Sequence, residues 1–370
     1  MKLYRMELYK LWHQKIFAIC AVCTVLITVF YFGALEVDME IAMVDGQRYY
    51  GYEAVKINRQ ITEKYRGELT DEKVAGIVEE YGLPSEVVYD YPGWRDANYL
   101  NGFVTDYLSD GYKRDWNNYK APTAVYAIAD TQLGEIEHAM GGKILFAYTN
   151  GWKAFLDTLQ MGMILTSVLV LLSVSTVFAQ EEQTKMLPLL FTTQEGKIKD
   201  TYAKMAAAFT LTVVVYIVMV LLCLLMSFCV FGLDGADCPL GMALSKELLV
   251  RFSVSYMPIA SFVRMILGMD LLAMLLLCAI TMCVSAHCTS SFGAVAMAAI
   301  LWGAPLLVRM LSGGLGYFFT SCMPLFLIMT DSVYEAVSWG TRYAVAMLWV
   351  IIALTLICAE EGCRVYRRQP

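Results

Sequence analysis

Long uninterrupted apolar runs constrain this chain more than any other feature of its sequence. Residues 165–177 and 271–284 are examples, and about twenty such residues in a helix span the roughly 30 Å hydrocarbon core of a bilayer. A backbone in lipid must satisfy its own hydrogen bonds, so helices are expected. The chain is 58% hydrophobic and 17% charged, whereas a soluble domain averages about 45–50% and about 25%. The sequence therefore predicts an all-α polytopic membrane protein.

The apolar runs predict six transmembrane helices, at about residues 16–35, 156–179, 205–231, 265–286, 292–310 and 342–358. Residues 1–15 carry one acid, Glu7, and four basic residues with apolar side chains at helical spacing, which is typical of an amphipathic helix on the cytoplasmic membrane surface. The C-terminal tail is also basic. An even number of spans and the positive-inside rule together predict that both termini are cytoplasmic.

The first two predicted spans are separated by a long polar segment, residues 36–155. It holds about twenty acids and twelve basic residues, a net charge of about −8, and about 120 residues suffice for an independent domain. Thr70 precedes an apolar face that contains Val74 and Ile77, which predicts a capped helix. We expect residues 36–155 to form a mainly helical extracellular domain. Residues 1–35, which precede it, form the amphipathic helix and the first span, and residues 156–370, which follow it, form the remaining spans.

Two connections within residues 156–370 differ from simple turns. Residues 312–340 are moderately apolar but broken by glycines and by Pro324, which predicts a re-entrant or interfacial segment. Residues 180–204 form a predicted cytoplasmic loop with a short leucine-rich stretch, a Thr192–Thr193 break and a basic restart at Lys197. This pattern suits a docking surface for another protein, but the residues alone favour an ordinary solvated loop.

The loop resembles one in type-2 ABC transporter permeases. In that family a span ends in acidic residues, a Leu-Leu-x-Thr-Thr-like run and a glycine–basic pair follow, and the next span begins with Ala-Lys. The corresponding residues here are Glu181, Glu182, Leu189, Leu190, Thr192, Thr193, Gly196, Lys197, Ala203 and Lys204. The chain departs from the pattern in lacking a glycine directly after the acids and in having Lys197 rather than arginine.

The resemblance implies a membrane-spanning permease subunit of an ATP-driven exporter in a bacterial plasma membrane. Residues 180–204 would be the coupling loop that contacts a cytoplasmic ABC ATPase subunit, and a second permease chain, identical or related, would complete the path. Efflux of a peptide, a lipid or a hydrophobic small molecule would follow. ATP and Mg²⁺ would bind the partner, so this chain would carry no cofactor.

Alternatives to transport remain open in the sequence. A membrane sensor or binding protein could use the extracellular domain without moving a substrate. An enzyme is not expected, because the chain has no phosphate-binding loop and no His-Glu-x-x-His or Gly-x-Ser-x-Gly motif. The three histidines fit no metal-ligand spacing, and no basic patch interleaved with aromatics suggests nucleic acid.

Few charged residues fall near the predicted spans. Asp270 and Arg309 would lie at similar depth in the fourth and fifth spans, which predicts an intramembrane ion pair or, alternatively, a substrate contact. Cys238 and Cys322 both fall in segments predicted to be external, where a disulfide between them is conceivable. The other cysteines in apolar runs are expected to pack as small hydrophobic residues.

Overall fold

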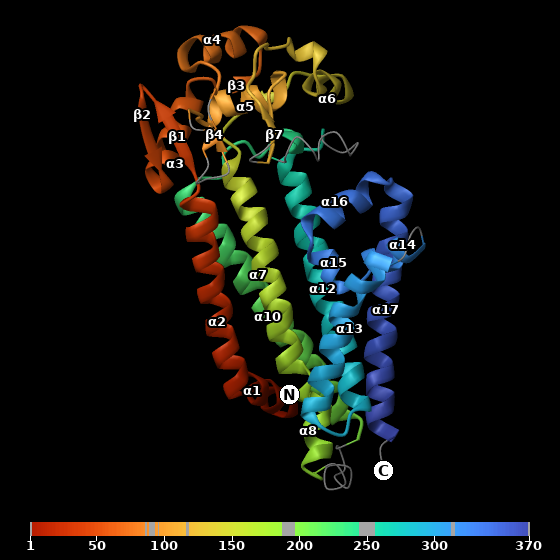
Figure 1. Cartoon of the computed structure of the whole chain (residues 1–370). Helices are drawn as coiled ribbons and strands as arrows, with labels where there is room; N and C mark the ends of the chain where they lie inside the picture. Colours follow the sequence, from red (N-terminus) through yellow and green to blue (C-terminus); the bar gives the residue numbers. More distant parts are fainter. Residues whose placement is uncertain are drawn as a thin grey trace. The chain divides into compact units, whose positions relative to one another are not determined.

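The computed structural model describes residues 2–85, 87–88, 93–94, 96–115, 118–186, 197–243, 256–311 and 315–368, and Figure 1 shows its elements. Within these ranges six helical segments are long and apolar enough to cross a membrane. They are Lys15–Val37, Asn150–Gln183, Lys199–Val230, Ile259–His287, Ser291–Leu311 and Thr341–Arg368. The prediction of an all-α polytopic membrane protein is confirmed.

The chain divides into two compact units. The bundle unit comprises residues 1–28, 159–222 and 265–370, and the insertion unit comprises residues 29–158 and 223–264. Four long helices contribute residues to both units: α2 (Lys15–Tyr31), α7 (Asn150–Val174), α10 (Lys199–Val230) and α12 (Ile259–His287).

The bundle unit also contains α1 (Lys2–Trp12), α8 (Thr176–Gln183), α13 (Ser291–Leu311) and α17 (Thr341–Arg368). The six spanning segments differ in burial. The most apolar windows of α7–α8 and of α12 are each 61% buried, whereas those of the other four segments are between 11% and 22% buried. Large apolar side chains such as Phe292, Leu311 and Trp349 are exposed. A soluble protein rarely exposes so much apolar surface, so this surface fits contact with lipid.

Polar side chains inside the bundle unit bond to backbone groups where a helix is interrupted. Ser175 separates α7 from α8, and Ser285 of α12 donates to its carbonyl at 2.7 Å. The same hydroxyl accepts hydrogen bonds from the amides of Phe178 and Ala179, each at 3.1 Å. Unpaired backbone groups are costly in an apolar interior. The Ser285 hydroxyl therefore stabilises the break between α7 and α8.

Residues 315–340 form three short helices in the bundle unit. They are α14 (Leu315–Ser321), α15 (Pro324–Ile328) and α16 (Thr330–Ser338). Pro324 occupies the first turn of α15, where its missing amide costs nothing, and all five residues of α15 are buried. The amide of Thr330 donates to Gln160 of α7 at 2.8 Å. The segment is thus packed against a spanning helix, while residues 312–314 lie outside the described residues.

Among its described residues the insertion unit contains a π-helical turn, Phe32–Val37, after the end of α2, and four α-helices that lie wholly within it: α3 (Gly51–Glu63), α4 (Asp71–Tyr81), α5 (Tyr99–Leu108) and α6 (Gln132–Met140). A 3₁₀ turn lies at Ile128–Asp130. Thr70 caps α4 by accepting a hydrogen bond from the amide of Lys73, as the sequence predicts.

Among the described residues of this unit, each sheet is a two-stranded antiparallel pair. These pair β1 (Ile41–Val44) with β2 (Gln47–Tyr50), β3 (Gly67–Glu68) with β8 (Leu145–Phe146), β4 (Val87–Val88) with β5 (Gly93–Trp94), and β6 (Tyr112–Asp115) with β7 (Asn118–Lys120). The β1–β2 register places Val44 opposite Gln47. Asp45 and Gly46 between them both have positive φ, which is the backbone of a type I′ hairpin turn.

The connection after α10 is part of the insertion unit rather than a separate linker. Phe231 packs in a core with Phe32, Val55, Tyr148 and Ala154. The carbonyl of Asp234 accepts from the Trp152 indole at 3.0 Å, and its carboxylate pairs with Arg59 at 3.1 Å. The insertion unit therefore includes residues 223–264, a segment about eighty residues further along the chain than the end of its first part.

The two cysteines considered for a disulfide are both buried and free in this structure. Burial raises the pKa of the Cys238 thiol to about 12. Cys238 belongs to the insertion unit and Cys322 to the bundle unit. A disulfide between them is not present.

Candidate functional site

A buried ion network in the bundle unit surrounds Lys204. The Lys204 side chain on α10 is 1% exposed, and its Nζ lies 2.6 Å from Asp200 and 2.9 Å from Glu181. Asp200 precedes it by one helical turn, a spacing that places both side chains on the same face of α10. Glu7 of α1 approaches Lys204 at 3.6 Å. One ammonium group therefore connects three carboxylates from three helices.

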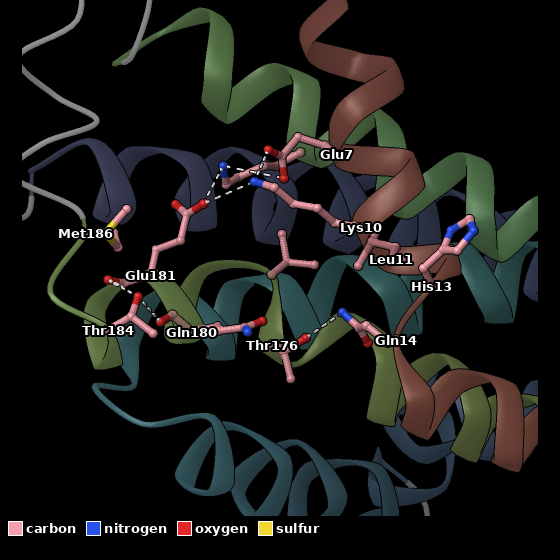
Figure 2. Close-up of a pocket in the computed structure, with 12 residues that line it drawn as sticks. Glu7, Lys10, Leu11, His13, Gln14, Thr176, Gln180, Glu181, Thr184 and Met186 are labelled. Atoms are coloured by element: carbon pink, nitrogen blue, oxygen red, sulfur yellow. Dashed lines mark hydrogen bonds and ion pairs between the residues drawn. The ribbon is translucent and has the colours of Figure 1, made fainter.

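Two further residues complete the network. Lys10 on α1 pairs with Glu7 at 2.6 Å and lies 3.9 Å from Glu181. The Tyr366 hydroxyl of α17 donates to Glu181, and its ring packs on Phe178 with centroids 4.4 Å apart. The network thus joins α1, α8, α10 and α17, which come from both ends and the middle of the chain. Figure 2 shows the part of it formed by Glu7, Lys10 and Glu181.

The balance of charge in this network is uneven. Glu7, Glu181 and Asp200 supply three carboxylates, whereas Lys10 and Lys204 supply two ammonium groups, so the five residues have a formal charge of −1. Removing ions from water is costly unless close partners replace the water. The short contacts around Lys204 provide that replacement, and the network is accordingly sensitive to the loss of any one member.

A cavity of about 430 Å³ lies beside the network. Figure 2 shows side chains from α1 on one side and from α8 on the other. The lining residues are Glu7, Lys10, Leu11, His13, Gln14, Thr176, Val177, Gln180, Glu181, Thr184, Met186 and Lys204. Across the cavity Gln14 donates to the Thr176 hydroxyl at 3.1 Å, which ties the turn between α1 and α2 to the start of α8.

The structure brings only part of the predicted coupling loop together. Glu181 at the end of α8 and Lys204 near the start of α10 are in direct contact. Glu182 also lies on α8, and Lys197 is exposed in the turn before α10. The remaining predicted loop residues, Leu189, Leu190, Thr192, Thr193 and Gly196, lie outside the described residues.

Sequence reasoning did not identify the other members of the network. Glu7 did give a signal, because it is the one acid among the basic first fifteen residues. Asp200 could have been found from its four-residue spacing to Lys204. Tyr366 gave no signal, since its contact with Glu181 joins residues 185 positions apart.

The predicted pair between Asp270 and Arg309 is not the one that the structure contains. Arg309 pairs with Glu335 of α16 at 3.1 Å, and its guanidinium lies over the rings of Tyr317 and Phe326. The chain after Arg309 folds back through α14 and α16, so a nearer acid takes the place of Asp270. Within the described ranges, Oδ1 of the buried Asp270 has no hydrogen-bond partner.

No group of three or more His, Cys, Asp and Glu side chains is arranged to hold a metal ion in the part of the chain that the structure describes. Comparisons with family models, curated proteins and solved structures found no match to this chain. The fold and the site therefore define only a class of protein. It is a multi-pass membrane protein in which a buried ion network joins the N-terminal helix to three other helices.

Proposed function

We propose that the chain is the membrane-spanning permease subunit of an ATP-driven ABC exporter. In this proposal it lies in a bacterial plasma membrane with both termini in the cytoplasm. A separate cytoplasmic ATPase subunit binds ATP and Mg²⁺, and a second permease chain completes the path. The cargo is a peptide, a lipid or a hydrophobic small molecule. The resemblance of residues 180–204 to the coupling loop of type-2 permeases is the basis of this assignment.

The contact between Glu181 and Lys204 is the observation that best supports the proposal. These residues flank residues 187–196, and the 2.9 Å contact between their side chains joins α8 to α10. Glu7 and Tyr366 attach α1 and α17 to the same two residues. A force applied to the intervening loop by an ATPase would therefore reach four helices through one rigid cluster, as a coupled conformational change requires.

The proposal is tested by co-purification with a phosphate-loop ATPase encoded beside this chain, followed by substitution within the loop. Gly196→Trp and Lys197→Glu should abolish stimulation of ATP hydrolysis by cargo, because they alter the surface expected to contact the ATPase. Both variants should still be found in the membrane. Lys143→Glu is the matched control, since Lys143 is an exposed residue of the insertion unit.

Two results would contradict the proposal. Unchanged coupling in both loop variants would remove the assigned role of residues 180–204. Labelling of a cysteine placed at Thr192 from outside intact cells would leave the loop where no cytoplasmic ATPase can contact it. A chain that binds an external ligand without any ATPase would instead favour the sensor alternative.

A further inference from the structure

The cavity between α1 and α8 has a lining that carries both signs of charge. The carboxylates of Glu7 and Glu181 lie on its wall together with the ammonium groups of Lys10 and Lys204. His13, Gln14 and Gln180 add groups that can donate hydrogen bonds. Figure 2 shows these side chains around the same space. Such a lining fits a ligand that itself carries one positive and one negative group.

The distribution of charge argues against a ligand of a single sign. The charged residues that line the cavity are Glu7 and Glu181, which are acidic, and Lys10 and Lys204, which are basic, so the wall has no net formal charge and a simple anion would meet two carboxylates. A simple cation would meet Lys10, whose side chain is 50% exposed and can turn toward a ligand. A primary ammonium beside Glu7 and Glu181 and a phosphate beside Lys10 satisfy both conditions, because charge-assisted hydrogen bonds form at each end.

The position of the cavity points to a lipid as the source of such a ligand. Helix α1 buries Glu7 and Leu11 on its inner face and exposes Met6, Tyr9 and Trp12 on its outer face. An amphipathic helix with exposed aromatic and apolar side chains lies in the interface between lipid headgroups and hydrocarbon. The first turn of α2 continues this surface with the exposed Ile16. We therefore expect the cavity beneath α1 to lie at headgroup depth.

We propose that the cavity between α1 and α8 binds the headgroup of a phosphoethanolamine-type phospholipid, with its ammonium on Glu7 and Glu181 and its phosphate on Lys10. His13, Gln14 and Gln180 surround the phosphate, and the acyl chains lie along the exposed apolar face of α1 and α2. The inference goes beyond the proposed transport function and does not depend on it, since a structural lipid can bind a membrane protein of any activity.

The test measures which phospholipid the purified full-length chain retains. The delipidated protein in detergent is mixed with equal amounts of phosphatidylethanolamine, phosphatidylcholine and phosphatidylglycerol that carry the same acyl chains. Bound lipid is then counted by native mass spectrometry. We expect about tenfold more phosphatidylethanolamine than either competitor, the effect of one charge-assisted hydrogen bond. Phosphatidylcholine has no N–H donor for the carboxylates, and phosphatidylglycerol has no cation.

Variants distinguish binding of lipid in the cavity from non-specific attraction of lipid to the basic helix α1. Lys10→Met and Gln180→Leu should each lower the amount of phosphatidylethanolamine retained about tenfold, because both side chains are placed on its phosphate. Gln180 lies outside the ion network, so that variant remains informative if Lys10→Met fails to fold. Lys15→Met should retain as much phosphatidylethanolamine as the unmodified chain, because Lys15 is an exposed basic residue nearby that does not line the cavity.

Three outcomes would overturn the proposal. Equal retention of phosphatidylcholine would mean that the ammonium is not recognised. Preferred retention of phosphatidylglycerol, reduced equally by Lys10→Met and Lys15→Met, would indicate non-specific attraction to basic residues. Displacement of the lipid by an equal concentration of soluble glycerophosphoethanolamine would identify a water-soluble ligand instead, because the acyl chains would then contribute nothing to binding.

Discussion

Lys204 is the residue on which the ion network depends, since its single ammonium group faces three carboxylates. Lys204→Met should lower the free energy of unfolding by about 3–5 kcal/mol, because it leaves buried charges without compensation. Thermal unfolding in detergent measures the effect. Lys143→Met is the matched control: it removes the exposed pair with Glu137, which is worth about 1 kcal/mol or less. Equal losses in the two variants would show that Lys204 does not stabilise the bundle.

For Asp270 we expect that removing the charge does not lower the stability of the protein. Its side chain is buried in α12, and no ion pair or hydrogen bond to Oδ1 is found among the described residues. Asp270→Asn keeps the size of the side chain and removes a charge that is costly to bury. The melting temperature should therefore stay unchanged or rise. A clear fall would indicate that the carboxyl group has a stabilising partner. Asp200→Asn serves as the contrast, because Asp200 bonds Lys204 and its loss should lower the melting temperature.

For single residues, the sequence predicted which charged side chains need an ion-pair partner better than it predicted which residue that partner is. Glu181 and Lys204 were assigned to one loop from its pattern, and they do contact each other. Arg309 was expected to need an acid, and it has one, but depth along neighbouring spans pointed to Asp270 instead of Glu335. The correct partner depends on how residues 315–340 fold back, and hydropathy carries no information about that path.

The spanning helices themselves were largely predictable. All six correspond to long apolar runs, because lipid leaves the backbone little choice but helix. Their ends were less accurate: α10 begins at Lys199 rather than near residue 205, and α17 continues to Arg368 rather than ending near residue 358. Hydropathy reports only the part of a helix in hydrocarbon, whereas the helix continues into the polar region beyond.

Long-range packing between elements was not predictable. Residues 231–243 belong to the insertion unit through contacts such as Thr149 with the carbonyl of Met242, 93 residues apart. From its own sequence, a turn rich in glycine and aspartate is predicted to be a linker. Only the structure shows that its side chains and carbonyls satisfy groups near the start of α7.

The close approach of α7 to this turn gives a prediction about packing. A Cβ on Gly151 would lie 1.9 Å from the carbonyl oxygen of Gly232, a contact that the backbone can relieve only by moving. Gly151→Ala should cost about 1–3 kcal/mol of stability, as overpacking does. Gly102→Ala is the control, because Gly102 lies within α5 with open space around it. Circular dichroism melts of both variants measure the difference, and equal melting temperatures would refute the packing argument.

The loop between α5 and the 3₁₀ turn gives a prediction about pH. Asp110 accepts hydrogen bonds from Lys120 at 2.5 Å and from the amides of Thr123 and Ala124, and these contacts hold the pKa of its carboxyl group below its usual range. The folded loop therefore binds fewer protons than the unfolded chain, so its stability is present above about pH 4 and is lost as the pH falls. Hydrogen exchange at the Thr123 amide should accelerate as the pH falls through this window, after correction for intrinsic rates.

Asp110→Asn isolates the charge in this prediction. The variant keeps an acceptor for the two amides but cannot change charge, so its corrected exchange at Thr123 should be faster at pH 7 and nearly independent of pH. An unchanged pH profile in the variant would mean that another group controls the loop.

On the scale of the whole molecule, crossing by all six apolar helices would leave the two termini on the same side of the membrane, and the proposed function requires that side to be the cytoplasm. Trypsin added to intact cells should therefore cut the insertion unit, where Lys64 and Lys143 have side chains about 60% and 56% exposed. Epitope tags at both termini should survive until the membrane is permeabilised. Inside-out vesicles should give the reverse pattern.

Each deviation from this pattern of cleavage would contradict a different prediction. Loss of one terminal tag together with the insertion unit would require an odd number of spans, so one of the six apolar helices would not cross. Loss of both tags with protection of the insertion unit would invert the chain. Residues 180–204 would then face away from ATP, and the network around Lys204 would stabilise the bundle without any coupling role. The orientation of the insertion unit is therefore decisive for the transport proposal, whereas the six-helix fold and the lipid site are independent of it.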